Sequence, residues 1–347
     1  MKTKIVATIG PSSEDISVLS KMVESGMDIA RMNFSHCTHD EYKKRREIIN
    51  IEAARLNKKV SILQDLQGPR IRVGNMPESG RSLVNGELVY FSANKEDNAA
   101  IFIDEPTLPD SIEVGHPIYL SSGDIELVVK DKTKLGFSAE VVRAGVLFSR
   151  KGVNVPETRL SVSSLTDKDW DDLEFALSLG VEYVAVSFVQ SGDDIRNIKN
   201  KIKGRAKIIS KIETAQALHN IDDIIKESDS IMIARGDLGV EVAMEKVPFI
   251  QKKLINQAHS YKKESIVATQ MLLSMMKSKK PTRAEVSDVA NAVIDGADMV
   301  MLSDETANGD YPVESLETMI RIVRETERLR ELYSDTTNIS ALSALTV

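Results

Sequence analysis

Short apolar segments recur along the chain, and most of them are separated by stretches whose apolar residues have helical spacing. Each segment is bounded by polar residues, Gly or Pro, which is typical of buried strands. This pattern predicts strands at residues 4–10, 27–35, 60–66, 181–188, 207–213, 230–239, 265–272 and 297–306. Eight strand–helix units of this size favour a closed (β/α)₈ barrel over an open, doubly wound sheet.

Capping signals agree with this alternation. Thr38 and Glu41 have the spacing of a capping box before a long charged helix. Ser13 is placed to cap a helix that ends at Gly26, and residues 167–179 carry apolar side chains on one helical face. Helices of this kind would cover the outside of the barrel.

The helical spacing disappears between residues 68 and 156. Alternating apolar runs replace it, separated by Gly, Pro, Asn and Asp, at residues 88–92, 117–120, 126–129 and 135–142. We therefore expect a small, barrel-like β domain inserted after the third strand, with residues 1–67 and 157–333 forming the catalytic barrel. Such an insertion can act as a lid over a site at the barrel mouth. Residues 334–347 have no helical period and are expected to form a flexible tail.

Composition narrows the class of protein. The 347 residues are 42% apolar and 28% charged, as in an ordinary soluble globular protein. The net charge of −7 argues against a nucleic-acid binder, and no apolar run has the length that a membrane span needs. The single cysteine, Cys37, excludes an intrachain disulfide, and the N-terminus has no signal-peptide pattern, so we expect a cytoplasmic protein.

Charged residues gather where predicted strands end. Lys211 and Glu213 close one strand, and Asp237 lies at the end of the next. Chemistry in parallel α/β folds is found at the carboxyl ends of the strands. A lysine beside two carboxylates suits a phosphoryl group with a divalent ion, and the lack of His or Cys favours Mg²⁺ or Mn²⁺ over zinc. A purely structural ion pair between Lys211 and Glu213 is the alternative.

Arg31, Asn33 and Ser35 alternate at the end of the second predicted strand, so their side chains share one face. Arginine binds phosphate oxygens through two hydrogen bonds, which indicates a phosphate or cation site. A solvated strand end is the alternative interpretation.

Two further strand ends carry candidate groups. Asp65 ends the third strand and is followed by Arg70 and Arg72, which favours phosphate handling over a turn with surface arginines. Gly236 lies at the end of the sixth predicted strand, where its backbone can approach an anionic ligand closely. Thr269 ends the seventh strand and offers a hydroxyl near the barrel axis.

Taken in order, these segments resemble the pyruvate kinases over nearly the whole chain. The matching stretches are KIVATIGPS (4–12), RMNFSH (31–36), DLQGPRIR (65–72), KGVNVP (151–156), ISKIE (209–213), MIARGDLGVE (232–241), ATQMLLSMM (268–276) and PTRAEVSDVANAVIDGAD (281–298). The family fold is a (β/α)₈ barrel with a β-domain lid after strand three. The resemblance implies phosphoryl transfer from phosphoenolpyruvate to ADP, giving pyruvate and ATP.

The resemblance also implies roles for the site residues. Glu213 and Asp237 would hold Mg²⁺, and Lys211 would stabilise the phosphoryl group during transfer. Arg31 and Arg72 would clamp phosphates. The backbone of Ala234-Arg235-Gly236 would bind the substrate carboxylate. Thr269 would help to place or protonate the enolate. His36 and Lys151 would approach the nucleotide.

Many pyruvate kinases need K⁺, which binds near the positions of Asn33, Ser35, Asp65 and Leu66. Those enzymes carry a glutamate where this chain has Arg70. A guanidinium there could supply the positive charge that K⁺ supplies in relatives. We therefore expect activity without K⁺.

The family's regulatory C-terminal domain has no counterpart in this sequence, so we expect no sugar-phosphate activation through it. A homo-oligomer formed through barrel contacts is expected. Two other functions stay open at this stage: a Mg²⁺-dependent lyase or aldolase acting on pyruvate-like 2-oxo acids, and a non-catalytic paralogue.

Overall fold

The computed structural model describes residues 1–159 and 164–334, and apart from Ser334 the predicted tail lies outside them. Eight parallel strands close into a barrel in the order β1-β16-β15-β14-β13-β12-β3-β2. The strands are β1 (Lys4–Thr8), β2 (Ile29–Asn33), β3 (Ser61–Asp65), β12 (Tyr183–Val186), β13 (Lys207–Ile212), β14 (Ser230–Ala234), β15 (Glu264–Ala268) and β16 (Met299–Leu302). The predicted (β/α)₈ barrel is confirmed.

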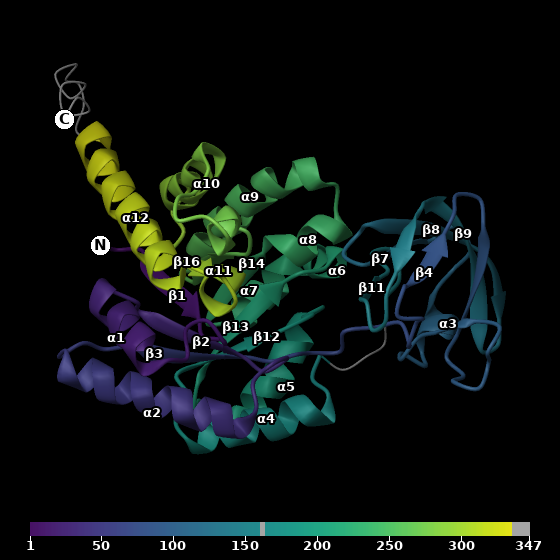
Figure 1. Ribbon diagram of the computed structural model, residues 1–347, viewed down its shortest axis with the longest axis horizontal. Helices are drawn as coiled ribbons and strands as arrows, with labels where there is room; N and C mark the ends of the chain where they lie inside the picture. The colour runs from purple at the N-terminus through teal and green to yellow at the C-terminus, as the bar shows by residue number, and fades with distance from the viewer. Residues whose placement is uncertain (160–163, 335–347) are drawn as a thin grey trace.

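Helices surround the barrel (Figure 1). They are α1 (Ile16–Ser25), α2 (His39–Arg55), α4 (Asp167–Ser178), α5 (Gly192–Ile202), α6 (Ala215–His219), α7 (Ile221–Glu227), α8 (Arg235–Glu241), α9 (Val247–Ser260), α10 (Arg283–Ile294), α11 (Asp304–Ala307) and α12 (Pro312–Ser334), with 3₁₀ turns η1 (Met244–Lys246) and η2 (Leu273–Met276). Within the described ranges, none of these helices is long and apolar enough to cross a bilayer.

The capping predictions are confirmed at α2 and corrected at α1. Thr38 and Glu41 form the expected capping box. At α1 the N-cap is Asp15, whose carboxylate accepts the Ser17 amide at 2.8 Å, and not Ser13. The Ser13 hydroxyl instead bonds with the backbone of Gly10, so it is already engaged in the preceding turn.

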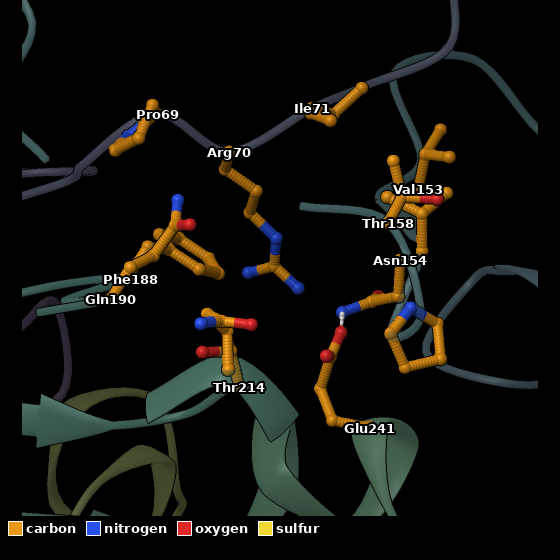
Figure 2. Close-up of a pocket in the computed structure, with 13 residues that line it drawn as sticks. Pro69, Arg70, Ile71, Val153, Asn154, Thr158, Phe188, Gln190, Thr214 and Glu241 are labelled. Atoms are coloured by element: carbon orange, nitrogen blue, oxygen red, sulfur yellow. Dashed lines mark hydrogen bonds between the residues drawn. The ribbon is translucent and has the colours of Figure 1, made fainter. Parts of the chain in front are cut away.

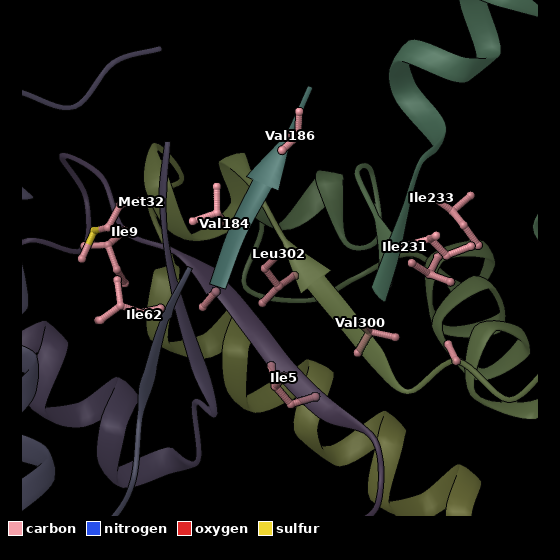
Figure 3. Close-up of a cluster of buried hydrophobic side chains, with 14 of the residues drawn as sticks. Ile5, Ile9, Met32, Ile62, Val184, Val186, Ile231, Ile233, Val300 and Leu302 are labelled. Atoms are coloured by element: carbon pink, nitrogen blue, oxygen red, sulfur yellow. The ribbon is translucent and has the colours of Figure 1, made fainter. Parts of the chain in front are cut away.

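Alternation along each strand sorts the core into two layers. Outward-facing residues such as Ile5, Ile62 and Val184 pack beneath the helices (Figure 3). Inward-facing residues such as Ile209 and Met232 fill the barrel interior. Side chains alternate between the two faces of a strand. At the carboxyl end of each strand, the next inward-facing residue after the apolar ones therefore lies at the barrel mouth.

A second β unit lies between β3 and β12, as predicted. Its elements are β4 (Arg81–Leu83), β5 (Leu88–Ser92), β6 (Ile101–Phe102), α3 (Leu108–Ser111), β7 (Pro117–Leu120), β8 (Ile125–Thr133), β9 (Gly136–Arg143), β10 (Gly145–Leu147) and β11 (Val153–Asn154). Six strands pair in the order β11-β7-β8-β9-β5-β6 around a separate apolar core. This unit, called the lid below, projects from one side of the barrel (Figure 1).

The two segments that join the lid to the barrel pair with each other. The Val153 amide donates to the Ile71 carbonyl and the Val73 amide to the Lys151 carbonyl, each at 2.9 Å. We call residues 70–73 and 150–154 the lid stem. Because the two segments of the stem are hydrogen-bonded to each other, the charged residues of both segments lie close together at the base of the lid.

Candidate active site

The site begins with β13, where Ile209 faces the barrel interior. Lys211 and Glu213 continue the same face to the mouth, as the alternation predicts. Glu213 is 2% exposed, and its carboxylate lies 2.9 Å from the Lys211 ammonium. The ion pair considered as an alternative therefore exists, but it is one contact in a larger charge network.

That network extends to β2 and β3. Asp65, at the end of β3, lies 3.1 Å from the Lys211 ammonium and 2.7 Å from the Arg31 guanidinium. Arg31 also donates to the Thr8 hydroxyl at 2.8 Å. Charges from three strands thus form a continuous buried chain from Arg31 through Asp65 and Lys211 to Glu213.

Electrostatics fix the protonation states of this chain. Burial alone would raise the pKa of Asp65, but the charges of Lys211 and Arg31 outweigh it and hold that pKa below its ordinary value. Burial alone would lower the pKa of Lys211, but Asp65 and Glu213 outweigh it and raise that pKa. Lys211 is therefore an ammonium at neutral pH.

Asp237 lies in the first turn of α8, beside this chain. Burial raises the pKa of Glu213 above its ordinary value, and the negative charge of Asp237 raises it further, although Lys211 opposes both. The two carboxylates therefore repel each other, and the charge of Lys211 only partly offsets this repulsion at Glu213. Arg70 approaches them from the lid stem, with its guanidinium 3.4 Å from Asp237 Oδ1.

A divalent ion fits this donor set. Among residues 1–159 and 164–334, no cluster of three or more His, Cys, Asp or Glu is arranged to hold a metal. Mg²⁺, however, is usually held by one or two carboxylates, and water and substrate oxygens complete its shell. Glu213 and Asp237 match that pattern.

Thr269 contacts the segment that follows β14. Its hydroxyl accepts the Gly236 amide at 2.7 Å. Thr269 has φ +72°, a conformation that is rare for a β-branched residue and costs about 1–3 kcal/mol. Such strain is common in active sites, and here it accompanies a hydroxyl aimed at a backbone amide.

The neighbouring Arg235 side chain is engaged elsewhere. Its guanidinium donates to Asp288 at 2.7 Å and to the Thr269 carbonyl at 2.8 Å. Ala234 is the last residue of β14 and is buried. In this segment, therefore, the Gly236 amide meets the Thr269 hydroxyl, while the Arg235 side chain secures the loop through the Thr269 carbonyl and Asp288.

Arginines gather on the lid stem. Arg72 donates its backbone amide to Asp104 at 2.6 Å and its guanidinium to the Arg150 carbonyl at 2.9 Å. Burial, together with the positive charges of Arg70 and Arg150, lowers the pKa of Arg72. Positive charge therefore gathers at the base of the lid and is only partly offset by the ion pair of Arg150 with Asp104 at 3.2 Å, an arrangement that favours an anionic ligand.

His36 and Lys151 are exposed, and the structure brings neither into contact with the buried charges. His36 is held in place through its backbone amide, which donates to the Asn33 carbonyl at 3.0 Å. Lys151 belongs to the lid stem. Both residues can reach a ligand only from the solvent side of the site.

The region expected to bind a monovalent cation is already hydrogen-bonded. The Leu66 carbonyl accepts the Ser187 hydroxyl at 2.8 Å, and Asn33 Oδ1 accepts the Ser35 amide at 3.1 Å. The Arg70 guanidinium, expected near this region, makes its ion pair with Asp237.

Two groups in the site had no role in the sequence interpretation. Ser187 bonds with Lys211 at 2.7 Å and could have been found by continuing the inward face of β12. Glu241 accepts a hydrogen bond from the Asn154 side-chain amide of the lid stem at 2.9 Å (Figure 2). It also accepts one from the Ala215 backbone amide at 3.4 Å. Figure 2 also shows the Arg70 guanidinium directed into the cleft that Asn154, Thr214 and Glu241 line. Glu241 thus joins the lid to the barrel.

Glu241→Gln is expected to stabilise the protein more at pH 7.5 than at pH 4.5. Burial raises the pKa of Glu241, and the charges of Asp237 and Glu213 raise it further. A raised folded-state pKa contributes stability that is present below the unfolded value and lost as pH rises through the folded value. Glutamine does not titrate, so the difference in Tm between the variant and the parent should grow with pH. A constant or shrinking difference would contradict this.

Comparisons with known proteins agree with the geometry. Residues 1–316 match the family model of the pyruvate kinase barrel domain. The chain is 43% identical to a pyruvate kinase of Thermococcus litoralis, covering 95% of this chain and 70% of that protein. It is 42% identical to a pyruvate kinase of Staphylococcus aureus, covering 97% and 60% respectively. The crystal structure of a pyruvate kinase from Cryptosporidium parvum superposes with a TM-score of 0.89 at 36% identity, covering 94% of this chain and 69% of that one.

The model match and the relatives extend across both the barrel and the lid, and the solved structure has the same fold. The chain therefore belongs to the pyruvate kinase family of phosphotransferases.

Proposed function

We propose that this enzyme transfers the phosphoryl group of phosphoenolpyruvate to ADP, with Mg²⁺ or Mn²⁺, giving pyruvate and ATP. The observation that carries the proposal is the Lys211 ammonium, held between the carboxylates of Asp65 and Glu213 at the barrel mouth. A lyase or aldolase acting on 2-oxo acids would have no use for three arginines at the base of a lid. A non-catalytic paralogue would have no need to keep these buried charges.

Glu213 and Asp237 are the residues that would hold the divalent ion. Their mutual repulsion supports this assignment, because a cation between them would relieve it. When bound, such an ion neutralises charge on the phosphoryl oxygens and orients them.

The remaining residues would position the phosphoryl group and stabilise its charge. Lys211 would place a fixed positive charge beside the group in transit, a preorganised interaction that needs little rearrangement. Arg31, oriented by Asp65, would bind phosphoryl oxygens from the barrel side. Arg72 and Lys151, from the lid stem, would meet the phosphates of the nucleotide together with His36.

The substrate carboxylate would bind at the loop after β14. The Gly236 amide donates to Thr269 Oγ1, and a carboxylate oxygen can take the place of that hydroxyl as acceptor. Thr269 would then be free to orient a water that protonates the enolate carbon. Asp237, next in sequence, would border the carboxylate.

A coupled assay tests this function directly. Purified protein, phosphoenolpyruvate, ADP and Mg²⁺ should produce pyruvate, detected by NADH oxidation with lactate dehydrogenase. Omitting ADP or chelating the metal should abolish the signal. Pyruvate release that continues without ADP would point to a lyase or phosphatase, and no turnover at all would favour the non-catalytic alternative.

Activity is expected without added K⁺. Arg70 already brings a guanidinium to the site, and Asp65 is paired with two cations. Steady-state rates in tetramethylammonium and in potassium buffers of equal ionic strength should agree within about twofold. Arg70→Glu should make the rate depend on K⁺, with Arg81→Glu in the lid as the charge-matched control. A strong K⁺ requirement in the parent enzyme would refute the prediction.

We also propose that the protein works in the cytoplasm and self-associates through barrel surfaces. Met244 and Phe249, on the neighbouring η1 and α9, are each 75% exposed. Exposed apolar side chains of this size favour burial against a partner surface. Light scattering on the parent and on Phe249→Glu tests the association.

A further inference from the structure

Ser187 lies directly after β12 and continues its inward face past Tyr183 and Ala185. The pairing of Val186 with Ser210 on β13 sets Ser187 beside Lys211. Ser187 is 2% exposed. A Cβ on Gly68 would lie 2.9 Å from Ser187 Cβ, so the chain before the lid stem packs tightly against this serine.

The direction of the Ser187 hydrogen bonds follows from its two partners. Ser187 Oγ lies 2.8 Å from the Leu66 carbonyl and 2.7 Å from the Lys211 ammonium. A carbonyl only accepts and an ammonium only donates, so the hydroxyl must donate to Leu66 and accept from Lys211. Its single proton is committed, and its lone pair is therefore aimed at Lys211.

The Lys211 ammonium has three protons and three partners. Two partners are the carboxylates of Asp65 and Glu213, at 3.1 and 2.9 Å, and the third is the Ser187 hydroxyl. The attraction of an ammonium to a carboxylate is stronger than its attraction to a neutral hydroxyl. Without Ser187, the ammonium would be free to move toward the two carboxylates and away from the position it needs for catalysis.

We propose that Ser187 is a positioning residue that holds the Lys211 ammonium in its productive orientation for phosphoryl transfer. The proposal rests on the role given to Lys211 in the proposed function. The Ser187 hydroxyl is oriented by its hydrogen bond to the Leu66 carbonyl, so that its oxygen accepts from Lys211, the group that would contact the substrate.

Ser187→Ala should lower kcat by about 10- to 100-fold while leaving the KM for ADP within about twofold, because Arg72 and Lys151, which are proposed to meet the nucleotide phosphates, lie on the lid stem. Ser187→Cys fills the same space with a weak acceptor, so kcat should stay low without a cavity. The matched control is Ser210→Ala. Ser210 is equally buried on the adjacent strand, but its hydroxyl bonds with Ser228.

A double-mutant cycle separates positioning from simple structural support. Ser187→Ala should lower the urea midpoint more in the parent than in a Lys211→Met background, where only the hydrogen bond to the Leu66 carbonyl is lost. If the loss is the same in both backgrounds, the serine acts through Leu66 and the proposal fails. The proposal also fails if Ser187→Ala and Ser210→Ala have equal kcat values. If the parent and Ser210→Ala show no kinase activity, it is the proposed function that fails.

Discussion

Lys211→Met is expected to lower kcat by about a hundred- to a thousandfold, the loss typical of removing one preorganised group that stabilises transition-state charge. Methionine keeps the length of the side chain but removes its charge and all three of its donors. The Lys211 ammonium is buried between Asp65 and Glu213 and is charged at neutral pH. No neighbouring cation can take its place without moving. The coupled assay measures the loss.

The same substitution should destabilise the fold, because it leaves buried carboxylates with less compensating charge. Breaking a buried ion pair by removing one partner costs about 3–5 kcal/mol. Arg31 still pairs with Asp65, so Glu213 carries most of this cost. Urea denaturation at pH 7.5 measures the change, and the assay should be run well below the transition.

Lys207→Met provides the matched control. Lys207 begins the same strand, β13, at the opposite end of the barrel, where its side chain is exposed. It should keep the parent's kcat and stability. If Lys211→Met retained more than a tenth of the parent kcat in folded protein, the electrostatic role given to this ammonium would be wrong.

The fold could be predicted because short apolar runs, typical of buried strands, alternate with segments of helical spacing along most of the chain. Apolar runs located every barrel strand, but several predicted ends were wrong. The strand predicted at 230–239 ends at Ala234, and residues 235–241 form α8. The strand predicted at 297–306 ends at Leu302, where α11 follows shortly. The apolar pattern could not reveal these ends, because short helices that are also partly apolar follow the strands.

The predicted site depended on residues that share a strand face. Alternation placed Lys211 and Glu213 together on one strand face, whereas the contact of Asp65 with Lys211 was not predicted and is seen only in the structure. Contacts between distant segments could not be predicted in this way. Glu241 meets Asn154 across 87 positions of the sequence, and only the folded lid stem brings them together. The partner of Arg70, Asp237, is likewise set by the path of the stem.

Glu213→Gln is expected to remove metal binding while leaving the metal-free protein at least as stable as the parent. The raised pKa of Glu213 means that its charged form is disfavoured in the fold, first by burial and then by Asp237. Glutamine keeps an oxygen that can accept the Phe188 amide, which the parent carboxylate accepts at 2.8 Å. Loss of the charge therefore relieves repulsion and removes a ligand in one step.

Thermal unfolding with and without Mn²⁺ separates these effects, because a ligand that binds only the folded state raises Tm. Adding Mn²⁺ should raise the Tm of the parent but change the Tm of Glu213→Gln only a little. At the same metal concentration, the kcat of Glu213→Gln should be lower than that of the parent by at least about a hundredfold. Glu264→Gln, at the far end of the barrel, is the control and should respond to Mn²⁺ as the parent does. If Glu213→Gln bound Mn²⁺ normally, the ion would have to be held elsewhere. If the metal-free variant unfolded at a markedly lower temperature, the Lys211–Glu213 ion pair would be chiefly structural, as the alternative interpretation holds.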